Sequence, residues 1–121
     1  MSFKASLEEI CTRTEGAVAA TIMGYDGIAI ETHEAAGGGG GVDINSSLVE
    51  YSNIFGQIRL AAQNLQAGTA TEFWVRTQQL AAHGRVVSDE HFVLLATKPD
   101  ANHGKARYML RIGAAKVAAE L

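Results

Sequence analysis

Histidine and cysteine are the side chains in this sequence with the most distinctive chemistry. The four histidines, His33, His83, His91 and His103, fall in separate segments, at none of the short spacings that metal-binding motifs use. The single cysteine, Cys11, lies on an apolar stripe of helical spacing, where a buried and unreactive thiol is the usual state. We therefore expect no catalytic residues, no metal ion and no cofactor in this chain, and we do not expect an enzyme.

A run of five glycines, Gly37–Gly41, is the next feature that could bind a ligand. A phosphate-binding loop needs Gly-Lys followed by Ser or Thr at the start of a helix, whereas Val42 and Asp43 follow here. Consecutive glycines have high backbone entropy and no side chains to bury. The sequence therefore predicts a flexible loop over residues 35–42.

Length and charge exclude several classes of protein. A chain of 121 residues is expected to form a single domain, here spanning residues 1–121. Its 10 basic and 13 acidic residues give a net charge of −3, so nucleic acid is not an expected partner. One cysteine cannot form an internal disulfide, and no apolar run is long enough for membrane insertion. We expect a cytoplasmic protein.

Apolar periodicity and turn residues predict the order helix, two strands, helix, three strands, helix. The expected elements are residues 2–14, 17–25, 28–33, 43–67, 69–76, 79–87, 91–97 and 102–121. Short connections between the strands favour an α+β fold in which a five-stranded antiparallel sheet carries helices on its faces. Asp26-Gly27, between two apolar runs, predicts a two-residue type I′ hairpin turn.

The long helix over residues 43–67 has more apolar positions than one small core needs. Tyr51, Phe55 and Ile58 are expected to face the sheet, which leaves apolar residues such as Ile54 and Leu60 to be covered by something else. A second copy of the same helix would cover them in an isologous homodimer. The alternative is that these residues are simply exposed.

Two further segments have properties of interaction surfaces. If the strand around Phe73, Trp74 and Val75 lies at a sheet edge, it presents unpaired backbone groups to a symmetry mate; otherwise it is central or covered. The hairpin tip carries Tyr25 and Ile28 around Asp26, as a recognition surface or as a cap on the core.

The last helix has a basic flank formed by Arg107, Arg111 and Lys116. Charged runs of this kind are usually solvated, although this one would also suit an acidic partner.

One stretch and the element order together resemble a known family. The segment Gly16–Glu31, most specifically Met23-Gly-Tyr-Asp-Gly-Ile28, is similar to the first hairpin of the Roadblock/dynein light chain family. Gly104–Arg111 resembles the entry to that family's last helix, and the resemblance covers the whole chain. The short length and Leu48–Tyr51 are most similar to small bacterial gliding-motility members of the MglC and MglB type.

This resemblance implies an α-β-β-α-β-β-β-α fold and a non-enzymatic homodimeric adaptor. The implied partners are another Roadblock-type GTPase regulator, a Ras-like GTPase and a polarity response-regulator protein, with recruitment to a cell pole through them. The hairpin residues Tyr25, Asp26 and Ile28 would dock the second Roadblock protein. The implied dimer interface comprises Tyr51, Ile54, Phe55, Ile58, Ala62, Phe73, Trp74 and Val75.

Direct regulation of a small GTPase is the alternative function. An activating protein often supplies an arginine to the γ-phosphate. The candidates are Arg59, Arg76, Arg85, Arg107 and Arg111, and none is expected on an exposed loop.

Overall fold

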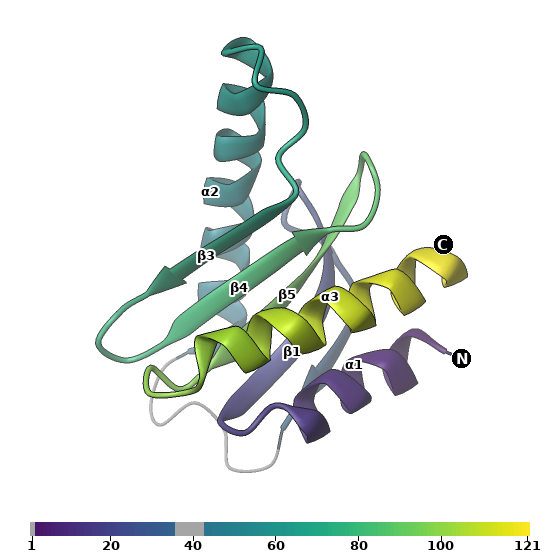
Figure 1. Ribbon diagram of the computed structural model, residues 1–121, viewed down its shortest axis with the longest axis vertical. Coiled ribbons are helices and arrows are strands. Elements are labelled where there is room, and N and C mark those ends of the chain that lie inside the picture. The colour runs from purple at the N-terminus through teal and green to yellow at the C-terminus, as the bar shows by residue number, and fades with distance from the viewer. Residues whose placement is uncertain (1, 36–42) are drawn as a thin grey trace.

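A single antiparallel sheet organises the molecule, and a computed structural model describes residues 2–35 and 43–121 (Figure 1). The elements are α1 (Phe3–Arg13), β1 (Ala17–Gly24), β2 (Ala29–Glu34), α2 (Ile44–Asn64), β3 (Glu72–Arg76), β4 (Ala81–Val86), β5 (His91–Thr97) and α3 (His103–Glu120). This order and the α+β class confirm the expectation from the sequence. Apart from Ala35, the loop expected over residues 35–42 lies outside the described residues.

The strands lie in the order β2-β1-β5-β4-β3, and all neighbours are antiparallel. The expected meander of β3, β4 and β5 is confirmed. Phe92–Thr97 of β5 are buried throughout, because this strand is central and has helices on both faces. The two edges of the sheet are β2 and β3.

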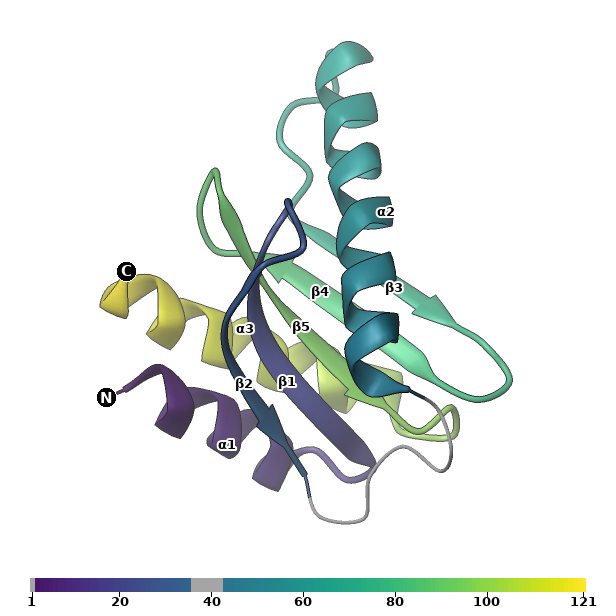
Figure 2. The same cartoon turned by 180° about the vertical axis from the view of Figure 1, so that it is seen from behind.

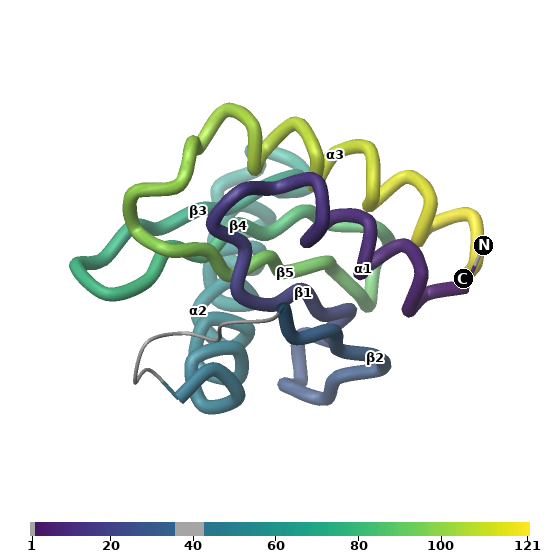
Figure 3. Tube along the Cα trace, turned by 90° about the horizontal axis from the view of Figure 1, so that it is seen from below, coloured from purple at the N-terminus to yellow at the C-terminus, as the bar shows by residue number. Residues whose placement is uncertain are grey.

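Helices cover the two faces of the sheet unequally. Figure 3 shows α1 and α3 side by side on one face and α2 alone on the other. Leu7, Ile10 and Leu110 form the core beneath α1 and α3. Gly113 of α3 lies so close to α1 that a Cβ atom there would overlap the side chain of Ile10, so the two helices leave little free surface between them.

Capping residues fix where the helices begin. The side chains of Ser2, Asp43 and Asn102 accept hydrogen bonds from backbone N–H groups three residues later, at 3.1, 3.2 and 2.9 Å. Each cap satisfies a donor that has no partner inside its own helix. In the described part of the chain, no helix has both the length and the apolar character needed to cross a bilayer.

The β1–β2 hairpin differs from the expected two-residue type I′ turn. Gly24 N–H donates to the Ile28 carbonyl and Gly27 N–H to the Gly24 carbonyl, both at 3.0 Å, so the loop has three residues. Only Gly27 has a positive φ, +86°, whereas a type I′ turn requires two such residues. The Asp26 carboxylate accepts from Ile28 N–H at 3.0 Å, which stabilises the longer loop.

Helix α2 extends well beyond the end of the sheet (Figures 1 and 2). Leu48, Ser52 and Phe55 are its buried residues, and none after Phe55 is buried. The expectation that Ile58 faces the sheet is therefore wrong, because the strands beneath α2 end before this turn. In the C-terminal half of α2, the large apolar side chains of Ile54, Ile58 and Leu60 are exposed.

Candidate protein-interaction surfaces

The first candidate surface is a stripe along α2, defined by Tyr51, Ile54, Ile58 and Ala62. The spacings of three and four residues place these side chains on one side of the helix. Ile54 and Ile58 are each 45% exposed, and Tyr51 and Ala62 are partly buried. We refer to these four residues as the α2 stripe. Adjacent exposed apolar side chains make this stripe a candidate for a protein–protein contact.

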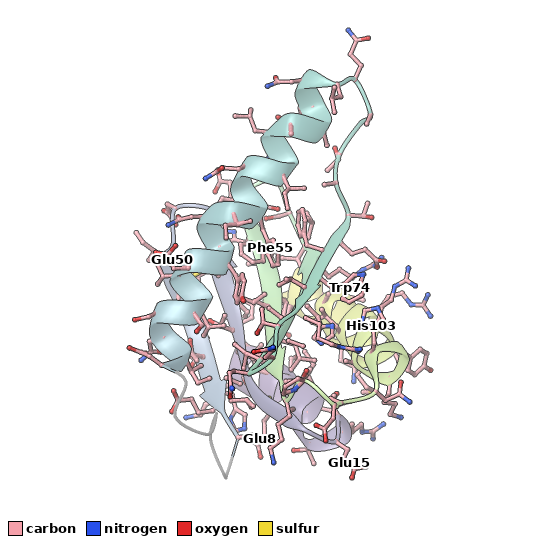
Figure 4. The ribbon with its side chains drawn as sticks, turned by 90° about the vertical axis from the view of Figure 1, so that its left-hand side faces the viewer. Glu8, Glu15, Glu50, Phe55, Trp74 and His103 are labelled. Carbon is pink, nitrogen blue, oxygen red and sulfur yellow. The ribbon has the colours of Figure 1, made fainter. Side chains whose placement is uncertain are left out.

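Phe55 and Phe73 lie beneath this surface. They are 2% and 7% exposed, and their rings stack with centroids 4.7 Å apart. Phe55 lies between α2 and the sheet (Figure 4). Of the eight residues expected at a dimer interface, these two thus belong to the protomer's own core. Val75 is partly buried beside them, and Trp74 points to the opposite face.

Strand β3 is an edge strand, which is the first of the two alternatives that the sequence allowed for the segment around Trp74. Trp74 is 54% exposed on the α3 side, and its ring packs against that of His103 with centroids 4.2 Å apart (Figure 4). His103 in turn stacks on His83 at 5.3 Å. The sequence did not predict this aromatic cluster, because the pairing of Trp74 with His83 depends on the register between β3 and β4.

His83 is the buried member of the cluster. It is 3% exposed, and its Nε2 lies 3.3 Å from Thr97 Oγ1. Burial lowers the pKa of His83 to about 4, and the charges of His103 and Arg76 contribute to this pKa in the same direction. His83 therefore belongs to the core in its neutral form.

The hairpin tip is the second candidate surface, and its three residues have different positions. The Tyr25 ring stacks on Phe92 at 5.0 Å, and the Arg59 guanidinium lies 4.6 Å from the centre of the Tyr25 ring, so this side chain packs inward. Ser52 Oγ donates to the Gly24 carbonyl at 2.9 Å and ties the tip to α2. Ile28 is 67% exposed. Tyr25 thus caps the core, whereas Ile28 and Asp26 face outward.

A hollow of about 370 Å³ lies beside the tip, between the hairpin, α2 and the β4–β5 turn. Ile28 and Ile30 supply apolar wall, and Asp26, Asp89 and Glu90 supply acidic side chains. Tyr25 and Arg59 also line the hollow, and Tyr25 Oη and Arg59 Nε are buried with no hydrogen-bond partner among the described residues. A partner that inserts here can satisfy polar groups that the single chain leaves unpaired.

A third candidate surface is a hollow of about 480 Å³ between β3, β4 and the first half of α3. Glu72 occupies it and accepts contacts from Arg85 at 2.9 Å and Arg107 at 2.5 Å. The hydrogen bond from Arg107 and the charges of both arginines hold the pKa of Glu72 below its usual value. Arg111 also lines this hollow. Lys116, expected in the same basic flank, instead contacts Glu9 of α1 at 2.8 Å.

The residues that could do covalent or metal chemistry are dispersed. Within residues 2–35 and 43–121, no group of three or more His, Cys, Asp or Glu side chains is placed to hold a metal ion. Cys11 is 7% exposed, and burial raises the pKa of its thiol to about 11, which suppresses the reactive thiolate.

Solved structures with the same fold are found among Roadblock proteins. The chain is 41% identical to MglC from Myxococcus xanthus over 100% of both chains, with a TM-score of 0.74. The gliding protein MglB from Thermus thermophilus is 16% identical with a TM-score of 0.82, over 98% of this chain and 90% of that one. A Roadblock/LC7 domain from Streptomyces avermitilis is 11% identical with a TM-score of 0.81, over 97% and 95%.

No family model and no curated protein matched the sequence. The two more distant structures show a shared fold alone, whereas the identity to MglC extends along the entire chain and is too high for fold similarity alone. The resemblance expected from the hairpin and the element order is thereby confirmed, and the protein belongs to the Roadblock/dynein light chain family.

Proposed function

We propose that this protein is a non-enzymatic homodimeric adaptor that binds another Roadblock-type regulator in a system controlled by a small Ras-like GTPase. The observation that carries the proposal is the exposed α2 stripe next to the unpaired edge strand β3. Similarity to MglC, and to an MglB described in a tetrameric arrangement, supports assembly as the mode of action. Its partners would recruit it to a cell pole.

The proposed dimer joins two copies through equivalent surfaces. Pairing of β3 with the β3 of a partner subunit satisfies the backbone groups on the open edge. The same two-fold relation brings the α2 stripes together, so that Ile54 and Ile58 of each copy become buried. Phe55 and Phe73 support this surface from beneath by fixing how α2 lies on the sheet.

Replacing Ile54 and Ile58 together with aspartate is expected to dissociate the dimer and to leave the fold of each protomer intact. Both side chains are exposed in the single chain, so the cost arises only where an unpaired charge is buried between subunits. We expect the dissociation constant to rise at least about 100-fold. Light scattering of this variant would give the mass of one chain, 12.8 kDa, whereas the wild-type dimer would give twice that mass.

Leu60→Asp is the matched control for this pair. Leu60 is an exposed apolar residue of the same helix, 57% exposed, but lies off the α2 stripe. This variant is expected to remain dimeric. A wild-type protein that is monomeric at micromolar concentration would refute the dimer, and equal dissociation by Leu60→Asp would refute the assignment of the stripe.

The hairpin tip is the proposed docking surface for the second Roadblock protein. Replacing Tyr25, Asp26 and Ile28 with alanine is expected to weaken binding of an MglB-type protein, measured by calorimetry. The Ile28→Ala variant is cleaner, because Ile28 is exposed whereas Tyr25 stacks on Phe92. We expect it to lower affinity roughly tenfold or more if Ile28 is an anchor residue.

Leu65→Ala controls for loss of an exposed aliphatic side chain, since Leu65 is 79% exposed at the far end of α2. Full affinity in the triple variant would disprove the docking site. A single-turnover GTP hydrolysis assay separates the adaptor from a direct regulator. Addition of this protein to a cognate Ras-like GTPase should leave the hydrolysis rate unchanged, and an acceleration would favour direct regulation.

A further inference from the structure

The arginine-lined hollow between β3, β4 and α3 has no role in the proposed dimer or in docking at the hairpin. We define the arginine hollow by Glu72, Arg85, Arg107, Tyr108 and Arg111. It lies on the face of the sheet that carries α3, whereas α2 covers the other face. The hairpin tip belongs to β1 and β2, at the opposite end of the strand order. A ligand in this hollow would leave the other two surfaces accessible.

The hollow already binds one carboxylate, that of Glu72. Arg85 and Arg107 each reach Glu72 through a single terminal nitrogen, one to each carboxylate oxygen. A guanidinium has five N–H donors, so these contacts use only part of the capacity of each arginine. The Arg107 side chain is 62% exposed, and its remaining donors are accessible to a second carboxylate.

Arg111 gives the hollow an excess of positive charge. It lies one helical turn after Arg107, and its guanidinium is 5.7 Å from the centre of the Tyr108 ring. Across the residues that the structure describes, no carboxylate forms an ion pair with Arg111. The hollow thus holds three arginines and one glutamate, in a chain whose net charge is −3. An incoming anion would relieve the repulsion between like charges four residues apart.

The geometry suits protein carboxylates. Arg107 and Arg111 are separated by one turn of α3, which places their Cβ atoms about 6 Å apart. Two acidic side chains of one partner segment can span that distance and pair with one arginine each. The half-exposed ring of Tyr108 also lines the hollow and offers apolar contact. A nucleic acid needs an extended basic surface, which three arginines in an otherwise acidic chain do not provide.

We propose that the arginine hollow binds a glutamate- or aspartate-rich segment of a partner protein, with Arg107 and Arg111 as its main contacts. Glu72 competes with this segment for Arg107, so it limits the affinity and holds the arginines in place when no partner is bound. This site is distinct from the proposed docking surfaces, because no residue of the hairpin tip or of the α2 stripe lines it. Its Glu72 lies on β3, the strand that the proposed dimer pairs, but Arg107 and Arg111 lie on α3.

The test is fluorescence anisotropy with a labelled eight-residue oligoglutamate peptide and the full-length protein at low salt. An oligoglutamine peptide of the same length controls for non-ionic binding. Arg111→Gln removes no ion pair of the described chain and is expected to lower affinity roughly tenfold, the typical contribution of a charge-assisted hydrogen bond. The double variant Arg107→Gln/Arg111→Gln should abolish measurable binding.

Lys105→Gln is the matched control, since it removes one positive charge from the same helix at an exposed position outside the hollow. Its affinity should stay within about twofold of the wild type, because an exposed charge outside the site contributes little. Glu72→Gln should raise the affinity several-fold by releasing the arginines. This opposite direction cannot arise from general loss of structure.

Three results would overturn the proposal. The first is full peptide affinity in the double arginine variant, and the second is an equal loss in Lys105→Gln. The third is tighter binding of a single-stranded oligonucleotide that the same arginine variants abolish, which would assign the hollow to nucleic acid.

Discussion

Replacing Phe55 with alanine is expected to lower the free energy of unfolding by about 3–5 kcal/mol, the usual cost of deleting a buried phenylalanine ring. Phe55 is 2% exposed, stacks on Phe73 at 4.7 Å and lies at a steep angle to the Phe92 ring at 6.1 Å. Gly84 of β4 leaves the space that the ring fills, because a Cβ atom there would lie 3.2 Å from Phe55 Cε2. Surrounding atoms on three elements cannot all collapse into the cavity.

Urea denaturation at fixed protein concentration measures this effect, because a dimer's stability depends on concentration. Phe55→Leu keeps part of the volume and should cost less than the alanine variant. Leu65→Ala removes a side chain that is 79% exposed and should change stability by no more than about 0.5 kcal/mol. A loss below about 1 kcal/mol for Phe55→Ala would contradict the placement of this ring at the centre of the α2 core.

Acidification is expected to remove about 3 kcal/mol of stability through His83 alone between pH 7 and pH 4. The pKa of His83 is lowered from 6.5 to about 4 in the folded chain, mainly by burial. Between these values the unfolded chain binds a proton that the folded chain does not, so stability falls as pH falls. Well above pH 6.5 both states are neutral at this residue, and it adds no pH dependence.

Comparison with His83→Gln isolates this contribution. Glutamine retains a polar group near Thr97 but does not titrate. Glu72, whose pKa is also lowered in the folded chain, contributes a loss of stability with the same sign, but it is present in both proteins and cancels in the difference. The variant should lose about 3 kcal/mol less than the wild type between pH 7 and pH 4. Equal losses of stability in the two proteins would show that the folded chain protonates His83 as readily as the unfolded chain does.

Local patterns predicted the elements well because each depends on neighbours in sequence. The apolar run of β5 identified the central strand, since only a strand covered on both faces is apolar at every position. The turn type at Asp26-Gly27 was wrong because loop length depends on the pairing of Gly24 with Ile28, which the two turn residues do not determine. The spacing of apolar residues in α2 identified its apolar face. It did not show that burial against the sheet ends after Phe55.

The candidate surfaces were predicted less completely, because they join residues distant in sequence. The hairpin tip was found from its own residues, yet the inward packing of Tyr25 depends on Phe92 and Arg59 from two other elements. The arginine hollow was seen only as a basic flank of α3. Its contact with Glu72 across β3 and β4 required the register that places Glu72 opposite Arg85.

The edge position of β3 has a consequence for avidity. In the proposed dimer, antiparallel β3 strands are related by a two-fold axis perpendicular to the sheet, so both α3 helices lie on the same face. Each arginine hollow borders β3 through Glu72, and the pair would flank that axis. A partner with two linked acidic segments would then engage both, the second at the high effective concentration that the linker sets. Dissociating the dimer would weaken such a partner without changing any residue that it touches.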